Sequence, residues 1–203
     1  VIHKVSSVDM ARKAEAAGVD AVVAMGFEAG GHIGREGITT FCLIPVLVGV
    51  LKIPVIASGG IGDAHGLLAA LALGAQGVEI GTRLVATSEC PVPVFFKDAL
   101  CQAPSNATVV LGKEAMPIRV LKNIITSHVA GLSDSEADRA IAAKGDVHYV
   151  ADGGDKDTAV MPCGQVVGLV NEVIPVRDLL FNMVSGARSI MESLDAMVSG
   201  GRP

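Results

Sequence analysis

The chain has 203 residues, of which 50% are hydrophobic, and a net charge of -5, so it can bury a sizeable core of aliphatic side chains. Its basic residues are scattered, which argues against a nucleic-acid-binding surface, and no apolar run reaches the ~18 residues of a membrane span. We therefore expect a globular, cytoplasmic protein that acts on small molecules. Whether two copies pair as a homodimer is left open.

Up to about residue 90, short β-branched runs alternate with Ala- and Leu-rich segments of helical period. Strands are predicted at 1–5, 20–25, 54–57 and 77–80, and helices at 8–17, 40–51 and 63–73, with Asp63 as a helix cap. Strands and helices that alternate through short connections are typical of βα units around a parallel sheet. Residues 1–90 are therefore predicted to form the C-terminal half of a TIM-type (β/α)₈ barrel, with the other strands expected before Val1.

After residue 90, prolines separate shorter segments, and we expect residues 91–163 to form a small helical insertion over the substrate site. Helices are predicted in it at 95–103, at 115–127 and from 133 to about 143. Residues 164–203 are expected to return to the barrel. Apolar residues at helical spacing predict a final amphipathic helix over 179–194 that covers it.

The first chemically informative segment is Gly26-Phe27-Glu28-Ala29-Gly30-Gly31-His32-Ile33-Gly34, which follows a predicted strand. Catalytic loops of α/β barrels lie at this end of the strands. Gly30 and Gly31 allow the backbone to approach a flat ligand, and His32 can present a ring nitrogen as hydrogen-bond donor or base. A loop histidine taken alone is more often a surface residue. Glu28 is expected to accept backbone hydrogen bonds rather than to act as an acid or base.

Two further glycine motifs, Ser58-Gly59-Gly60-Ile61 and Gly81-Thr82-Arg83, end the next two predicted strands. In many α/β barrels the loops after the last two strands bind phosphate through backbone N–H groups and a helix N-terminus. Thr82 adds a hydroxyl donor, whereas Arg83 either adds charge or pairs with a carboxylate such as Glu79 or Glu89. Each motif alone predicts only a tight turn, but the two together favour a phosphate site.

In their order and spacing, the Glu28–His32, Ser58–Ile61 and Gly81–Arg83 motifs resemble the nitronate monooxygenases and the related FMN-dependent enoyl-acyl-carrier-protein reductases. The similarity runs to about residue 123 and resumes at 164–169. The resemblance implies one bound FMN, with His32 as the active-site histidine. It also implies a set of cofactor-binding residues, namely Gly30, Gly31, Ser58, Gly59, Gly60, Gly81, Thr82 and Gln165.

The leading functional hypothesis is oxidation of alkyl nitronates by O₂, in which His32 deprotonates neutral nitroalkanes or orients the anionic nitronate. The alternative is NAD(P)H-dependent reduction of an enoyl thioester through the flavin, in which His32 positions the substrate. Two further hypotheses are a non-catalytic half barrel and a flavin-free phosphate-binding barrel. The second of them leaves the Glu28–His32 motif unexplained. No metal site is expected, since no cluster of ligands with suitable spacing occurs.

Overall fold

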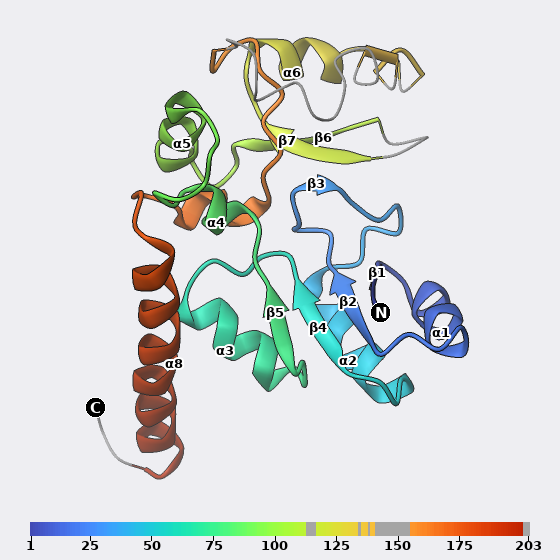
Figure 1. The fold of residues 1–203 in the computed structure, drawn as a ribbon, viewed down its shortest axis with the longest axis vertical. Helices are drawn as coiled ribbons and strands as arrows, with labels where there is room; N and C mark the ends of the chain where they lie inside the picture. The colour runs from blue at the N-terminus through green and yellow to red at the C-terminus, as the bar shows by residue number, and fades with distance from the viewer. Residues whose placement is uncertain (113–116, 134, 138, 141–154, 201–203) are drawn as a thin grey trace.

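The computed structural model describes residues 1–112, 117–133, 135–137, 139–140 and 155–200. Its base is a parallel sheet with the strand order β1-β2-β4-β5, formed by β1 (Ile2–Val5), β2 (Ala21–Met25), β4 (Val55–Ser58) and β5 (Gly77–Glu79). The strands are linked through α1 (Val8–Ala16), α2 (Thr40–Val50) and α3 (Ala64–Ala72), as Figure 1 shows. The succession of βα units predicted for residues 1–90 is therefore confirmed, with nearly the predicted bounds.

Polar side chains fix where two of these helices begin. Ser7 Oγ accepts a hydrogen bond from Met10 N at 3.3 Å at the start of α1, and Asp63 Oδ1 accepts one from Gly66 N at 2.9 Å at the start of α3. Both satisfy N–H groups that have no partner within the helix. The cap predicted at Asp63 is confirmed, and it ends the glycine-containing loop that follows β4.

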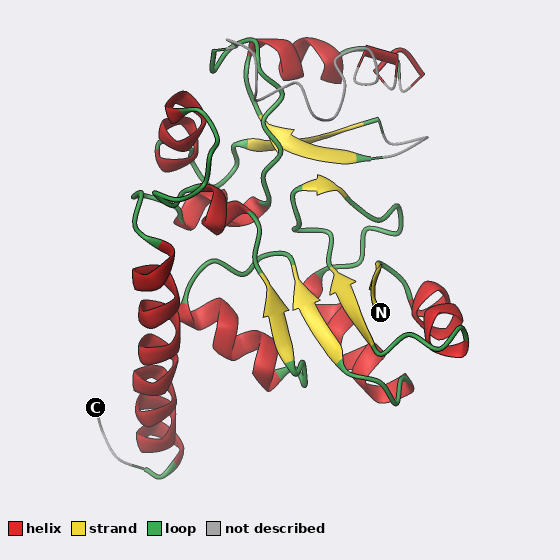
Figure 2. Ribbon diagram, in the orientation of Figure 1, coloured by secondary structure: helices red, strands yellow, loops and turns green. Residues whose placement is uncertain are grey.

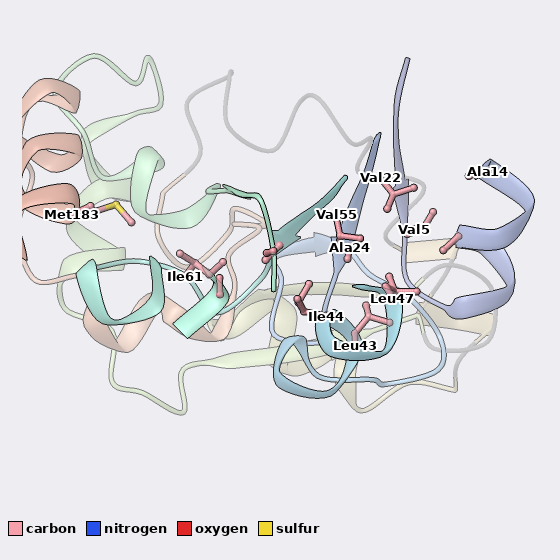
Figure 3. Packing of buried hydrophobic residues seen from close by; sticks show 14 of the residues in the cluster. Val5, Ala14, Val22, Ala24, Leu43, Ile44, Leu47, Val55, Ile61 and Met183 are labelled. Atoms are coloured by element: carbon pink, nitrogen blue, oxygen red, sulfur yellow. The ribbon is translucent and has the colours of Figure 1, made fainter. Parts of the chain in front are cut away.

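The core lies between α2 and the parallel sheet (Figure 3). Leu43, Ile44 and Leu47 of α2 are almost completely buried, as are Val22 of β2 and Val55 of β4. Packing of branched aliphatic side chains removes apolar surface from water and stabilises this layer. The sheet is thereby a firm support for the loops at its carboxyl end.

The parallel sheet is curved. Lys4 Nζ of β1 lies 2.6 Å from Glu79 Oε1 of β5, although β2 and β4 separate these two strands. In a flat sheet the outer of four strands would be about 14 Å apart, and side chains stand roughly perpendicular to a sheet. The salt bridge therefore indicates a concave face, as in a barrel wall. The described strands form an open sheet, and closure into a barrel is not seen among them.

A second, antiparallel sheet lies at the carboxyl ends of the parallel strands (Figure 2). Its strand order is β3-β7-β6, formed by β3 (Gly31–His32), β7 (Ile118–Leu121) and β6 (Thr108–Leu111). It is accompanied by α4 (Thr82–Val85), α5 (Val94–Cys101), α6 (Ile124–Ala130) and the 3-10 helix η1 (Gln165–Leu169).

This second sheet corrects the prediction of a helical insertion over 91–163. The helix expected at 95–103 is confirmed as α5, whereas the one expected at 115–127 is wrong over residues 118–121, which form β7, and α6 begins only after its cap, Asn123. The run Ile-Arg-Val-Leu of β7 is buried and pairs with β3 on one side and β6 on the other. This pairing with distant strands outweighs the local sequence pattern that predicted a helix. In the helix expected at 133–143, residues 135–137 and 139–140 are helical, and residues 134, 138 and 141–143 lie outside the described part of the chain.

The chain returns to the parallel sheet through α8 (Val176–Val198), which runs alongside α3 (Figure 1). Leu179, Met183 and Ala187 form its buried side. The backbones approach closely, since a Cβ on Gly186 would lie 2.7 Å from the Cβ of Ala64. The predicted final helix is confirmed, and none of the helices described is long and apolar enough to cross a membrane.

Candidate active site

A pocket opens at the carboxyl ends of the parallel strands and brings the sequence motifs together. Its walls come from the loop after β2, the loops after β4 and β5, and a segment just before η1. The lining residues are Lys4, Met25, Glu28, Ala29, Gly30, Gly31, Ser58, Gly59, Gly60, Ile61, Glu79, Gly81, Thr82, Val85, Pro162, Gly164 and Val166. Of the residues predicted to bind the cofactor, all except Gln165 are in this set.

One side of the pocket is suited to an anion. Gly59 and Gly60 have φ values of 101° and 75°, which favour glycine. Within the described chain, the backbone N–H groups of Gly60, Ile61, Gly81 and Thr82 have no hydrogen-bond acceptor. Unpaired amides at strand ends and at a helix start are the groups that bind phosphate in many proteins. These four amides are therefore available to an anionic ligand.

Glu28 lines the pocket, and its carboxylate caps a helix. It accepts hydrogen bonds from Thr40 N at 2.8 Å and from Thr40 Oγ1 at 3.0 Å, at the first residue of α2. A carboxylate satisfies and stabilises a helix N-terminus. Thr40 Oγ1 also lies 2.9 Å from the carbonyl of Gly59, so it connects two pocket loops. The expectation that Glu28 accepts backbone hydrogen bonds is confirmed.

Lys4, Ser58 and Glu79 form a polar cluster at the pocket, of which only Ser58 was predicted to belong to the site. Glu79 Oε1 accepts hydrogen bonds from Lys4 Nζ at 2.6 Å and from Ser58 Oγ at 3.0 Å. The signal in the sequence was one charged residue in each of two strands, Lys4 in β1 and Glu79 in β5, which does not reveal that the two side chains meet. Of the two roles left open for Arg83, pairing with a carboxylate such as Glu79 is not what the structure shows, because its buried guanidinium donates to backbone carbonyls, at 3.0 Å to Ala86.

The segment 162–166 is held tightly against the other pocket loops. Gly164 N donates to Thr82 Oγ1 at 2.8 Å, and Gln165 N donates to the Glu28 carbonyl at 2.9 Å. A Cβ on Gly30 would lie 2.4 Å from the carbonyl carbon of Cys163, so only glycine fits there. Thr82 acts here as an acceptor, which leaves its O–H proton for donation to a ligand.

His32 and Gln165 lie at the border of the pocket rather than in its lining. His32 is half-buried in β3, opposite Ile118 of β7, while its neighbour Gly31 lines the pocket. The residue Gln165 is exposed, and its two neighbours in the chain line the pocket. The structure thus places both residues beside the site without bringing their side chains into its wall.

Cys163 is completely buried behind Gly30. Burial raises the pKa of this thiol to about 12, although Arg119 acts in the opposite direction. The thiol is therefore protonated at neutral pH and unsuited to act as a nucleophile. No group of three potential metal ligands comes together in the described residues.

A family model described as nitronate monooxygenase matches residues 1–186. A probable nitronate monooxygenase of Staphylococcus aureus (strain JH9) is 32% identical over 95% of this chain and 57% of that protein. Among solved structures, FabK from Thermotoga maritima has a TM-score of 0.89 at 35% identity, over 97% of this chain and 63% of that one. The structure of a nitroalkane oxidase from Streptomyces ansochromogenes has a TM-score of 0.76 at 29% identity, over 95% and 58%. The chain thus spans 57% of the length of the first of these relatives.

Proposed function

Because the chain belongs to the nitronate monooxygenase family, a family of oxidoreductases, we propose that it binds FMN and oxidises alkyl nitronates with O₂ as the electron acceptor. One observation carries the proposal: the unpaired amides of the glycine loops and the Glu28–Gly31 loop face one pocket, with His32 directly beside it. The similarity to a probable nitronate monooxygenase and to a nitroalkane oxidase supports the choice of substrate.

The hydrogen-bond donors that line the pocket suit the phosphate of FMN. The amides of Gly60, Ile61, Gly81 and Thr82 would hold the phosphate, because they lack acceptors within the described chain. Gly31, at which a Cβ would meet no atom closer than 4.0 Å, would leave room for a flat ring against the backbone. When bound, the flavin would take up electrons from the nitronate and pass them to O₂.

His32 would handle the proton and the charge of the substrate. Its imidazole would accept the proton from the α-carbon of a neutral nitroalkane, or donate a hydrogen bond to an oxygen of the anionic nitronate. The polar cluster of Lys4, Ser58 and Glu79 supplies further hydrogen-bonding groups at the pocket.

The test is to mix the FMN-loaded protein anaerobically with NADH and then NADPH, while following the flavin absorbance, and to measure O₂ consumption with an alkyl nitronate. We expect the absorbance to persist and O₂ to be consumed. Rapid bleaching by either nucleotide, reversed by an enoyl thioester, would contradict the proposal. Stoichiometric FMN in the purified protein would also exclude a non-catalytic half barrel and a flavin-free barrel.

The second candidate function is NAD(P)H-dependent reduction of an enoyl thioester by the same flavin. The observation that favours it is the similarity to FabK, an enoyl-acyl-carrier-protein reductase. FabK has a TM-score of 0.89, which is higher than the 0.76 of the nitroalkane oxidase. The glycine loops and His32 would serve both reactions, so the response to NAD(P)H is the discriminating measurement.

A further inference from the structure

Arg119 is a buried cation to which the proposed chemistry assigns no role. The residue is only 3% exposed, and its Nε has no hydrogen-bond partner within the described chain. Its other nitrogens donate to two uncharged groups, at 3.1 Å to Thr108 Oγ1 and at 2.9 Å to the carbonyl of Phe27. Burial of a charge is costly unless it is well paired. A guanidinium in this position therefore needs an explanation.

The strongest contacts of Arg119 fall at the start of the loop that leads from β2 to His32. Besides the hydrogen bond to the Phe27 carbonyl, the guanidinium carbon lies 4.7 Å from the centre of the Phe27 ring, a cation–π contact. The far end of the loop is held by the residue that precedes β7, because Ile33 N donates to the carbonyl of Pro117 at 2.9 Å. Both ends of the loop 27–33 are therefore attached to one side of the second sheet.

From this geometry we infer that Arg119 is a positioning residue, which fixes the loop carrying Gly30, Gly31 and His32 beside the pocket. The two glycines give this loop high conformational freedom in the absence of external contacts. Arg119 restricts it from a strand that lies opposite Gly31 in the second sheet. The expected effect on turnover rests on the proposed function, whereas the restraint of the loop by Arg119 does not depend on it.

The decisive variant is Arg119→Met, which removes the donors and the charge but keeps a long side chain in the space. The substitution removes the cost of burying an unpaired charge and leaves the carbonyl of Phe27 without its donor, which lowers stability. Arg119→Lys keeps the charge and one donor for the Phe27 carbonyl. Arg83→Met is the matched control, since Arg83 is also buried and also donates to backbone carbonyls, at a different place.

We would measure amide hydrogen exchange of the loop in the FMN-loaded protein, together with kcat and KM for an alkyl nitronate. In Arg119→Met, exchange at Ile33 and its neighbours should rise about tenfold or more, while exchange in β2 and β4 stays unchanged. The kcat should fall by about tenfold or more with little change in KM, since small misplacements of a catalytic group slow the chemical step. Arg119→Lys should recover part of both effects, and Arg83→Met should leave exchange of the loop unchanged.

Unchanged exchange of the loop in Arg119→Met would overturn the inference, as would an equal rise across the parallel sheet or the same rise in Arg83→Met. A loosened loop with unchanged kcat would also overturn it, because the residue would then be structural only. Exchange does not depend on which substrate is used. If the unsubstituted protein consumes no O₂ with nitronates but the exchange pattern appears, the proposed function fails while the restraint by Arg119 stands.

Discussion

The substitution Thr82→Val tests the hydrogen bond that holds the segment 162–166 against the pocket. Thr82 Oγ1 accepts from Gly164 N at 2.8 Å, and both residues are buried. Valine has nearly the shape of threonine, so the change removes the acceptor without opening a cavity. The Gly164 N–H is then left without a partner away from water, which costs about 1–3 kcal/mol.

This cost corresponds to roughly a 5- to 150-fold lower equilibrium constant for folding. The protein has no tryptophan, so urea unfolding is best followed by far-UV circular dichroism. We expect a lower midpoint with an unchanged slope, because the buried surface stays the same. The variant should also bind FMN more weakly, since the hydroxyl that we expect to donate to the phosphate is lost.

Thr82→Ser is the matched control, because it keeps the hydroxyl and removes only the methyl group. It should retain most of the stability and of the affinity for FMN. A Thr82→Val protein as stable as the unsubstituted one would refute the reasoning. Destabilisation by Thr82→Ser but not by Thr82→Val would instead assign the loss to packing of the methyl group, which valine keeps.

His32→Ala should leave FMN binding nearly intact and lower nitronate turnover by roughly a hundredfold or more, the usual size of a general-base contribution; unchanged steady-state turnover would remove His32 from the mechanism. Gly60→Val should release FMN, because a φ of 75° strains a β-branched residue. The flavin-to-protein ratio after gel filtration checks this, with Gly49→Val on α2 as a control that should retain FMN. Burial raises the pKa of the Cys163 thiol from 9.0 to about 12. The protonated thiol therefore contributes to the free energy of unfolding below pH 9, and this contribution is lost as the pH rises towards 12. The urea midpoint should therefore fall less over this range in Cys163→Ala than in the unsubstituted protein.

The parallel βα units could be predicted because their signals are local. A buried parallel strand is a continuous apolar run, as at Ala21–Met25, and a cap such as Asp63 marks where the next helix starts. The phosphate loops could be found for the same reason, since Gly59 and Gly60 directly follow β4 and Gly81 lies two residues after the end of β5.

The second sheet and the polar cluster could not be predicted, because both depend on partners far away in the sequence. The strand Gly31–His32 has two residues and exists through its pairing with Arg119 and Ile118. A short apolar run such as Ile118–Leu121 cannot be assigned to helix or strand by periodicity alone. In the same way, Lys4 and Glu79 are 75 positions apart, and only the curvature of the sheet brings them together.

The close passage of Gly30 against the backbone of Cys163 and Gly164 limits how this chain could be recombined with a relative. A Cβ on Gly164 would lie 2.6 Å from the carbonyl of Glu28, so neither glycine accepts a side chain. The helical insertion was predicted to end at residue 163. A crossover between residues 163 and 164 would place the backbone of one parent against the Glu28–Gly31 loop of the other. Chimaeras that exchange this region should fold more readily when residues 26–31 and 162–166 are inherited from the same parent.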